Sequence, residues 1–230
     1  MPEDESVLSR AAEAPTRTVA YGGHPDQVFD VFPGAAERTA VLLHGGFWRP
    51  AYDRVHLYPM ANAMQAAGWT AITVEFRRIP GDPGATVEDV RAALSAVGGE
   101  VVLLGHSAGG HLALHAAATA PQHVRGVVAL APVADLARAS ALGLSGNAVA
   151  AFLGDHDPAG FDPRLLAPRR PVTIVHGSAD ETVPIEVAES YRDSHPDIRF
   201  VRLPGEGHYC VIDPLTGPFQ VVLDEAAALG

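Results

Sequence analysis

The sequence predicts an α/β protein with a mostly parallel sheet of about eight strands and helices on both faces. From Thr18 onward, short apolar or β-branched runs alternate with Ala-rich segments of helix length, which is typical of this class. The run Val101–Leu104 is apolar without alternation, as expected of a strand covered on both faces. The chain has 230 residues, 47% of them hydrophobic and 19% charged, so it can bury one sizeable core. We therefore expect a single domain over 18–230, with no large cap domain.

Strands are predicted where short apolar or β-branched runs lie between turn residues. In chain order they are Thr18–Tyr21, Gln27–Phe32, Thr39–His44, Thr70–Phe76, Val101–His106, Gly126–Ala131, Pro171–His176 and Arg199–Leu203. The first two are joined through Gly22-Gly23-His24-Pro25, a sequence that favours a hairpin turn. The later strands are separated by helix-length segments, which favours parallel pairing.

Helices are predicted in the Ala-rich segments that have stop residues at their ends. They cover Tyr58–Ala67, Thr86–Val97, Ala108–Thr119, Glu186–Ser194 and Pro218–Leu229. Thr86 is the expected N-cap of the second helix, with Asp89 three residues later. Residues 1–17 lack periodicity and are expected to form a loose N-terminal arm with at most one short helix. Residues 132–170 are expected to form a short lid-like insertion with one or two short helices.

The charge and cysteine content exclude several classes of protein. Asp and Glu outnumber Lys and Arg by 27 to 16, and a net charge of −11 repels phosphate backbones, so we expect no nucleic-acid partner. A single cysteine cannot form an internal disulfide. The segment Met1–Glu5 lacks the features of a signal peptide, and no apolar run reaches the roughly 20 residues of a membrane span. We expect no membrane partner and a cytoplasmic location, and the oligomeric state stays open.

The strongest local motif is Gly105-His106-Ser107-Ala108-Gly109, which matches the pattern G-x-S-x-G. An apolar strand leads into it and a helix leads out, which is the context that a nucleophile elbow requires. The flanking glycines lack Cβ atoms and let neighbouring backbone approach the strained serine turn. Ser107 is therefore the candidate nucleophile.

A nucleophilic serine needs a base, and the base needs an orienting acid. Asp180 follows the predicted strand Pro171–His176, and His208 follows the strand Arg199–Leu203. The chain order serine, aspartate, histidine is the one expected for Ser107, Asp180 and His208 on one sheet edge. Asp135, after the sixth strand, is a rival for the acid.

A glycine-rich segment, His44-Gly45-Gly46-Phe47-Trp48, follows the third strand. Glycine backbone beside a nucleophile can present N–H groups to a developing oxyanion without side-chain obstruction. With this segment, the chain resembles an α/β-hydrolase of the group that carries an His-Gly-Gly oxyanion motif. That group includes hormone-sensitive-lipase-like esterases and kynurenine formamidases, and the form His-Gly-Gly-x-Trp resembles the formamidases.

The resemblance implies the roles of the site residues. Ser107 would be the nucleophile, Asp180 and His208 the acid and base, and the N–H groups of Gly46, Phe47 and Ala108 the oxyanion hole. Apart from the resemblance, the aromatic side chains of Trp48 and Tyr209 are candidates to contact the acyl or aryl group of the substrate. Two features depart from the esterase relatives: Val74-Glu75-Phe76-Arg77-Arg78 follows their Asn/Asp-Tyr-Arg pattern only loosely, and the N-terminal arm is too short for their cap.

Other reactive residue types are interpreted as structural. His111 and His115 lie four apart on one helix like metal ligands, but they lack the glutamate of H-E-x-x-H, so a packed helix face is favoured and no metal is expected. His106 and His176, at strand ends, are expected to make structural hydrogen bonds. Cys210 is interpreted as an inert buried thiol.

The sequence thus predicts a serine hydrolase that cleaves a small carboxylic ester or an N-formyl or aryl amide through an acyl-enzyme. No cofactor is expected, and the expected partner is a small-molecule ester or amide substrate. An arylformamidase and a generic short-chain carboxylesterase are both left open. A non-catalytic binding protein of the same fold is disfavoured because all three triad residues are present.

Overall fold

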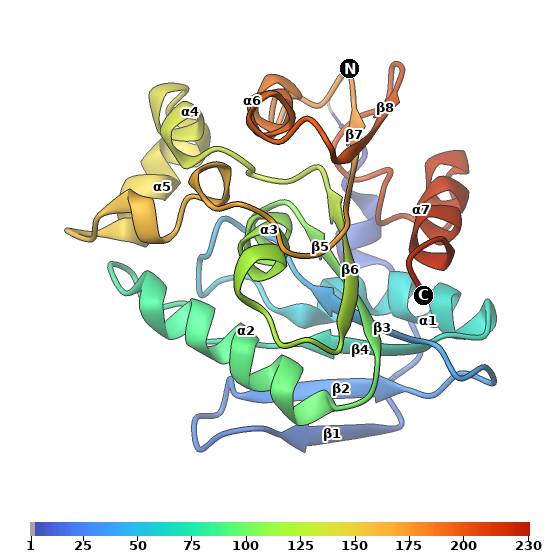
Figure 1. Cartoon of the computed structure of the whole chain (residues 1–230). Coiled ribbons are helices and arrows are strands. Elements are labelled where there is room, and N and C mark those ends of the chain that lie inside the picture. Colours follow the sequence, from blue (N-terminus) through green and yellow to red (C-terminus); the bar gives the residue numbers. More distant parts are fainter. Residues whose placement is uncertain (1–2) are drawn as a thin grey trace.

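The computed structural model describes residues 3–230 and contains a single eight-stranded sheet flanked by helices (Figure 1). Its strands are β1 (Arg17–Ala20), β2 (Val28–Phe32), β3 (Thr39–Leu43), β4 (Thr70–Val74), β5 (Val101–His106), β6 (Val124–Leu130), β7 (Val172–Gly177) and β8 (Arg199–Leu203). The spatial order is β1-β2-β4-β3-β5-β6-β7-β8. The six strands β3–β8 are mutually parallel, whereas β2 is antiparallel to both β1 and β4. The eight predicted strands are confirmed, with small differences at their ends.

The helices cover both faces of the sheet, as predicted. They are α1 (Tyr58–Ala66), α2 (Pro83–Val97), α3 (Ala108–Thr119), α4 (Leu136–Ala141), α5 (Leu144–Leu153), α6 (Glu186–Ser194) and α7 (Gly217–Ala227), with short 3₁₀ helices η1 (Ser6–Ser9), η2 (Arg54–Leu57), η3 (Pro158–Gly160) and η4 (Pro163–Leu165). Figure 1 shows α2 and α3 on one side of the sheet and α1 and α7 on the other. None of the helices in residues 3–230 has the length and apolarity that crossing a bilayer requires.

The two faces of the sheet bury separate cores because side chains alternate along each strand. On β3, Val41 and Leu43 belong to the core under α2 and α3, whereas Ala40 and Leu42 belong to the core under α1 and α7. All four are 0–1% exposed. The central strands are therefore apolar on both sides, which explains the unalternating sequence pattern.

The predicted start of α2 was wrong by about one turn. The helix begins at Pro83, and its N-cap is Asp82, whose side chain accepts the Ala85 N–H at 3.0 Å. Proline suits this first helical position because its missing N–H has no partner there in any case. Thr86 lies inside the helix and donates its hydroxyl to the Arg77 carbonyl at 2.7 Å.

The N-terminal segment that we expected to be loose packs against the domain over its described residues. Val7, in η1, is 1% exposed in the core beside α1. Arg10 donates to Asp213 Oδ2 at 2.8 Å, and the Glu3 carboxylate accepts the Glu181 N–H at 2.5 Å. These contacts tie the segment to the loops that follow β7 and β8.

The segment 132–170 holds α4, α5 and two 3₁₀ turns. Val149 and Phe152 of α5 are 3% and 4% exposed and belong to the core that also lies under α2 and α3. Near its start, α5 contains a left-handed stretch in which Ser145, Gly146 and Asn147 have φ between 48° and 66°. The segment 132–170 is therefore a packed part of the domain rather than a detached cap.

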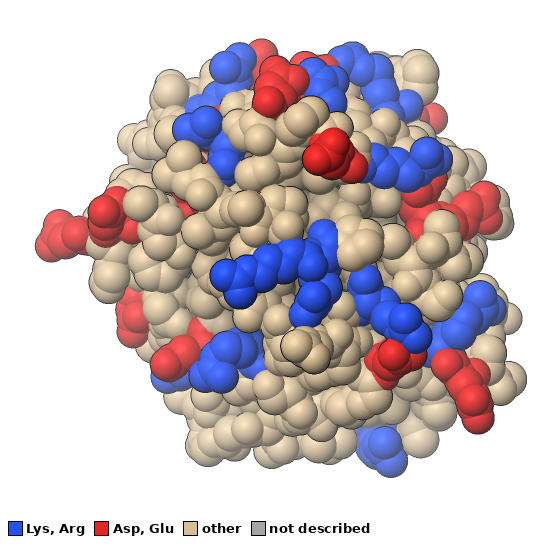
Figure 2. Space-filling view, viewed as in Figure 1, with Lys and Arg blue, Asp and Glu red and all other residues tan. Residues whose placement is uncertain are grey.

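Charged side chains of both signs share the face drawn in Figure 2. Several charged side chains form surface ion pairs, such as Arg125 with Glu100 at 2.5 Å and Arg192 with Asp193 at 2.8 Å. Exposed pairs of this kind contribute little to stability, so the fold rests mainly on its two apolar cores.

Candidate active site

Ser107 occupies a tight turn between β5 and α3. Its φ of 56° and ψ of −117° are unusual for a residue with a side chain. The turn is held by the Ser107 N–H, which donates to the Leu130 carbonyl at 2.9 Å, and by the Ser107 carbonyl, which accepts the Val133 N–H at 3.2 Å. Strain that surrounding structure holds in place is typical of functional sites.

The glycines of the motif are required by close backbone contacts. A Cβ atom on Gly105 would lie 2.2 Å from the Gly109 carbonyl oxygen, and one on Gly109 would lie 2.2 Å from the Leu43 carbonyl oxygen. Both distances are far inside van der Waals contact, so no larger residue fits without moving the backbone. The glycine spacing therefore packs α3 against the ends of β3 and β5.

Asp180 and His208 form a buried hydrogen-bonded pair. His208 Nδ1 lies 2.7 Å from Asp180 Oδ2, and the two residues are 1% and 7% exposed. The other oxygen, Asp180 Oδ1, accepts the N–H groups of Thr182 at 2.9 Å and Val183 at 2.7 Å. Burial alone would raise the pKa of Asp180, but hydrogen bonds from His176 and His208 hold it well below its usual range. The carboxylate is thus ionised at neutral pH and faces the imidazole.

Two buried histidines, His176 and His106, contact this pair. His176 Nε2 lies 2.9 Å from the Val183 carbonyl oxygen and 3.1 Å from Asp180 Oδ2. His106 Nε2 lies 3.1 Å from the His208 carbonyl oxygen, and their rings are 4.6 Å apart. Because His106 directly precedes Ser107, this contact brings the loop of His208 to the serine turn. The structural roles expected for both histidines are confirmed.

Asp135, the other candidate for the acid, forms its hydrogen bonds with α4 and α6. It caps α4 by accepting the Arg138 N–H at 2.8 Å, and it accepts the Ser190 hydroxyl at 2.5 Å. Arg164 Nε lies 3.2 Å from its second oxygen. Its hydrogen bonds thus hold α4 and α6, whereas Asp180 is the carboxylate on His208.

The glycine-rich loop after β3 lies beside the serine. A Cβ atom on Gly45 would be 3.0 Å from Ser107 Cβ. The next three residues, Gly46, Phe47 and Trp48, have φ values of 104°, 49° and 55°. Ala108 is the first residue of α3. The N–H groups expected to form an oxyanion hole therefore lie in two backbone segments that meet at Ser107.

The family of the chain follows from its sequence match. A model of the "Alpha/beta hydrolase family" matches residues 40–168, more than half of the chain, and the match includes the Ser107 turn and the glycine-rich loop. The chain belongs to the alpha/beta hydrolase family.

This α/β hydrolase is similar to known esterases. It is 26% identical over 237 residues to esterase LipC of Mycobacterium tuberculosis, and the match covers 84% of the chain but only 59% of the length of LipC. Among solved structures, a truncated carbohydrate esterase from gut microbiota has a TM-score of 0.78 at 18% identity, covering 95% of this chain and 98% of that one. Esterase B from Lactobacillus rhamnosis has a TM-score of 0.78 at 17% identity, covering 98% of this chain and 89% of that one. These structural likenesses show the shared fold.

The two residues expected to contact substrate have different surroundings in the α/β hydrolase. Trp48 is 5% exposed and stacks on Phe152, with ring centroids 4.4 Å apart. Tyr209 is half-buried and meets the His208 ring edge-on at 5.0 Å. Tyr209 and His208 also line a cavity of about 510 Å³ under the N-terminal segment. Tyr209 therefore lies against the candidate base, whereas Trp48 lies inside the protein.

Sequence reasoning missed a buried charge cluster beneath the glycine-rich loop. His44 Nε2 lies 3.0 Å from Glu75 Oε1, and Glu75 also pairs with Arg78 and accepts the Arg54 N–H at 3.1 Å. Burial, together with the Arg78 guanidinium, lowers the pKa of His44 to about 3, so the ring is neutral. The sequence feature that could have revealed this cluster is Glu75, an acidic residue directly after the apolar strand Thr70–Val74. It lies in the segment that departs from the esterase pattern.

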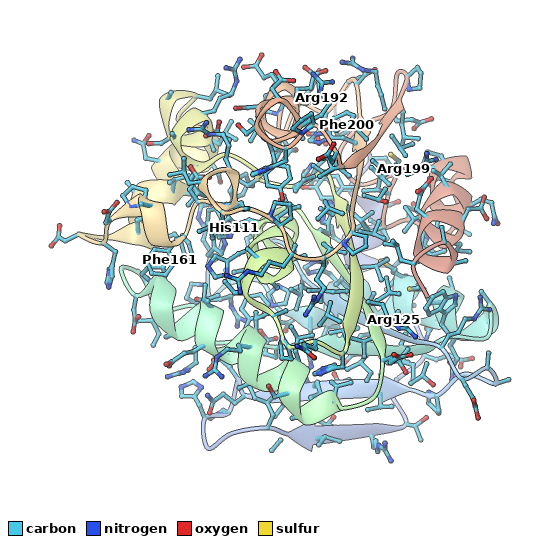
Figure 3. All side chains as sticks on the ribbon, viewed as in Figure 1. His111, Arg125, Phe161, Arg192, Arg199 and Phe200 are labelled. Atoms are coloured by element: carbon cyan, nitrogen blue, oxygen red, sulfur yellow. The ribbon has the colours of Figure 1, made fainter. Side chains whose placement is uncertain are left out.

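The remaining reactive side chains have structural partners. His111 Nε2 lies 2.9 Å from the Phe161 carbonyl oxygen, and His115 Nε2 lies 3.2 Å from that of Gly160, so both hold the insertion against α3 (Figure 3). Burial raises the pKa of the Cys210 thiol to about 12, which keeps it protonated at neutral pH. Within residues 3–230 there is no cluster of three or more His, Cys, Asp or Glu side chains that could hold a metal.

Proposed function

We propose that this α/β hydrolase cleaves small carboxylic esters through an acyl-enzyme on Ser107. The observation that carries the proposal is the buried His208–Asp180 pair, with a 2.7 Å hydrogen bond, in the loop that meets the strained Ser107 turn. The named esterases among the relatives support the ester as substrate class.

The proposed chemistry needs only side chains and backbone of this chain. Ser107 Oγ attacks the ester carbonyl while His208 Nε2 takes its proton, and Asp180 keeps the remaining imidazole proton on Nδ1. The carbonyl electrons move to oxygen, whose negative charge is met by the N–H groups of Gly46, Phe47 and Ala108. Collapse of this intermediate expels the alcohol, which takes the proton from His208. Water then attacks the acyl-enzyme by the same steps and releases the acid, with no cofactor.

The second candidate is hydrolysis of an N-formyl aryl amide. The motif His44–Trp48 resembles that of kynurenine formamidases, and formyl is the smallest acyl group that an oxyanion hole can serve. Against it, the Trp48 ring is buried on Phe152, so Tyr209 is the aromatic residue beside His208 that is left for an aryl group. Stacking there would contribute about 0.5–1.5 kcal/mol. We therefore favour the short-chain ester.

The test is an activity-based probe followed by a substrate panel. A fluorophosphonate should label the wild-type protein and fail to label Ser107→Ala. Labelling that persists in the variant would refute the nucleophile assignment. In the panel, p-nitrophenyl acetate and butyrate should be cleaved far faster than the palmitate, and N-formylkynurenine should be turned over detectably. A kcat/KM for the formamide more than about a thousandfold below that of the acetate, about 4 kcal/mol, would exclude the formamidase.

A further inference from the structure

The glycine-rich loop has a backbone that its own sequence does not favour. Phe47 and Trp48 have φ values of 49° and 55°, in the left-handed region. For bulky residues this region is an outlier, and such residues persist there only when surrounding structure holds them. Gly46, at φ 104°, meets no such penalty. A tertiary contact must therefore hold Phe47 and Trp48.

That contact is made by the Trp48 ring. It stacks on Phe152 of α5 with an interplanar angle of 17° at 4.4 Å, and it meets the His111 ring edge-on at 5.1 Å. His111 and Phe152 are themselves in edge contact at 5.5 Å, so the three rings form one cluster. All three residues are at most 5% exposed. The tryptophan is thereby held by two residues that lie far from it in sequence.

The cluster joins the elements that the proposed reaction must align. His111 lies in the first turn of α3, and its backbone N–H donates to the Ser107 carbonyl at 3.1 Å. Its Nε2 lies 2.9 Å from the carbonyl oxygen of Phe161, and Figure 3 labels both residues, His111 on α3 and Phe161 on the insertion. Burial lowers the pKa of His111 to about 3, so the ring is neutral and packs as an apolar surface. One ring cluster therefore connects the loop of Gly46 and Phe47, the serine turn and the insertion.

We propose that Phe152 and His111 are positioning residues that hold Trp48, and through it the amides of Gly46 and Phe47, in the geometry of the oxyanion hole. The inference rests on the proposed esterase function. It assigns the insertion the role of a fixed brace and makes Trp48 an anchor of the loop rather than a substrate contact. Without the stack, Phe47 and Trp48 would relax to negative φ, and the amides would turn from the carbonyl oxygen.

The test compares two matched variants, Phe152→Leu and Phe161→Leu. Both remove a phenylalanine ring from the same insertion. The Phe161 ring meets Phe152 edge-on, with centroids 6.5 Å apart, but within residues 3–230 it has no ring contact with Trp48. Its carbonyl, which bonds His111, is unchanged by the substitution. On p-nitrophenyl acetate, Phe152→Leu should lower kcat about ten- to hundredfold with KM nearly unchanged, because misplaced amides affect only the transition state. Phe161→Leu should stay within about threefold of wild type.

A transition-state analogue separates positioning from general damage. An alkyl trifluoromethyl ketone is attacked by Ser107 Oγ, and its carbonyl oxygen becomes an oxyanion, so its Ki should rise in Phe152→Leu by the same factor by which kcat falls. A second readout uses Trp69→Phe, which leaves Trp48 as the sole tryptophan of the chain. In that background, Phe152→Leu should change the fluorescence of Trp48, and Phe161→Leu should not.

The results distinguish a failure of the positioning role from a failure of the proposed function. Equal losses of kcat in the two variants at equal Tm, or a rise in KM alone for Phe152→Leu, would refute the proposed positioning role of Phe152. If Phe152→Leu does not fold, Trp48→Phe should retain activity within about tenfold and Trp48→Leu should lose kcat beyond that, and the reverse order would refute the inference. A wild-type protein that hydrolyses no ester and takes no fluorophosphonate would instead refute the proposed function.

Discussion

Replacing Asp180 by asparagine should convert the His208 imidazole to the wrong tautomer. Asp180 Oδ1 accepts two backbone N–H groups, from Thr182 and Val183, whereas Oδ2 faces His208 Nδ1. An asparagine must keep its oxygen toward the two N–H groups, because its NH₂ cannot accept them. The NH₂ then points at His208 Nδ1 and donates to it. The imidazole proton moves to Nε2, which can no longer take the proton of Ser107.

The size of the effect follows from this loss of the base. Amidation of a triad aspartate lowers kcat by about 10⁴-fold in a serine protease with the same arrangement, which corresponds to about 5 kcal/mol of transition-state stabilisation. Asp135→Asn is the matched control, since Asp135 is also buried at 4% exposure and hydrogen-bonded but binds α4 and α6. We expect this variant to lower Tm and to keep kcat within about threefold.

The assay is kcat on p-nitrophenyl acetate at pH 8, with Ser107→Ala as the blank for spontaneous hydrolysis. Circular dichroism should show that both variants are folded. A loss under about tenfold in Asp180→Asn, or a greater loss in Asp135→Asn, would mean that the acid lies after the sixth strand and that the tautomer argument is wrong.

Three further outcomes are expected. Gly109→Ala should destabilise the protein by about 2–3 kcal/mol in urea unfolding, because its Cβ would lie 2.2 Å from a carbonyl oxygen. Gly23→Ala, whose Cβ would meet nothing within 4 Å, should leave the free energy of unfolding unchanged. Equal effects of the two substitutions would refute the argument that close backbone packing requires glycine at 109. Exhaustive chelation should leave kcat unchanged, whereas a loss that zinc restores would mean that His111 and His115 bind metal. Burial raises the pKa of Asp89, but hydrogen bonds from Arg77 outweigh it and hold the pKa below its usual value. This carboxylate therefore stabilises the fold above pH about 4 and loses that effect as pH falls. The difference in Tm between wild type and Asp89→Asn should narrow in acid. A difference that widens in acid would contradict the direction of this pKa shift.

Most of the fold could be predicted because its signals are local. The central strands are apolar on both faces, and the turn at Ser107 needs glycine at two fixed positions. Such patterns are visible within ten residues of sequence. The pairing of Asp180 with His208 was predictable for a related reason: each follows a parallel strand, and parallel strands end at one sheet edge.

What could not be predicted depends on contacts between distant residues. The sequence could not show that Trp48 turns inward, because its partner Phe152 lies more than a hundred residues away. Nor could it show that Val7 is buried, since the surrounding surface comes from α1 and η2. The start of α2 was missed for a simpler reason, because Asp82-Pro83 and Thr86 are both acceptable helix starts and only tertiary packing selects between them.

The register of the sheet explains how four separated loops come to one point. Leu43 of β3 pairs with Gly105 of β5, so the glycine-rich loop and the serine turn leave the sheet at the same level. Gly177 of β7 likewise pairs with Leu203 of β8, three residues before Asp180 and five before His208. A slip of one residue between β3 and β5 would displace Gly46 by about 3.3 Å and would turn every side chain of the strand to the opposite core. The fit of Val41 and Leu43 in one core and of Ala40 and Leu42 in the other therefore fixes the site together with the glycines. A polar substitution at Val41 or Leu42, far from the serine, should weaken the site by weakening this register.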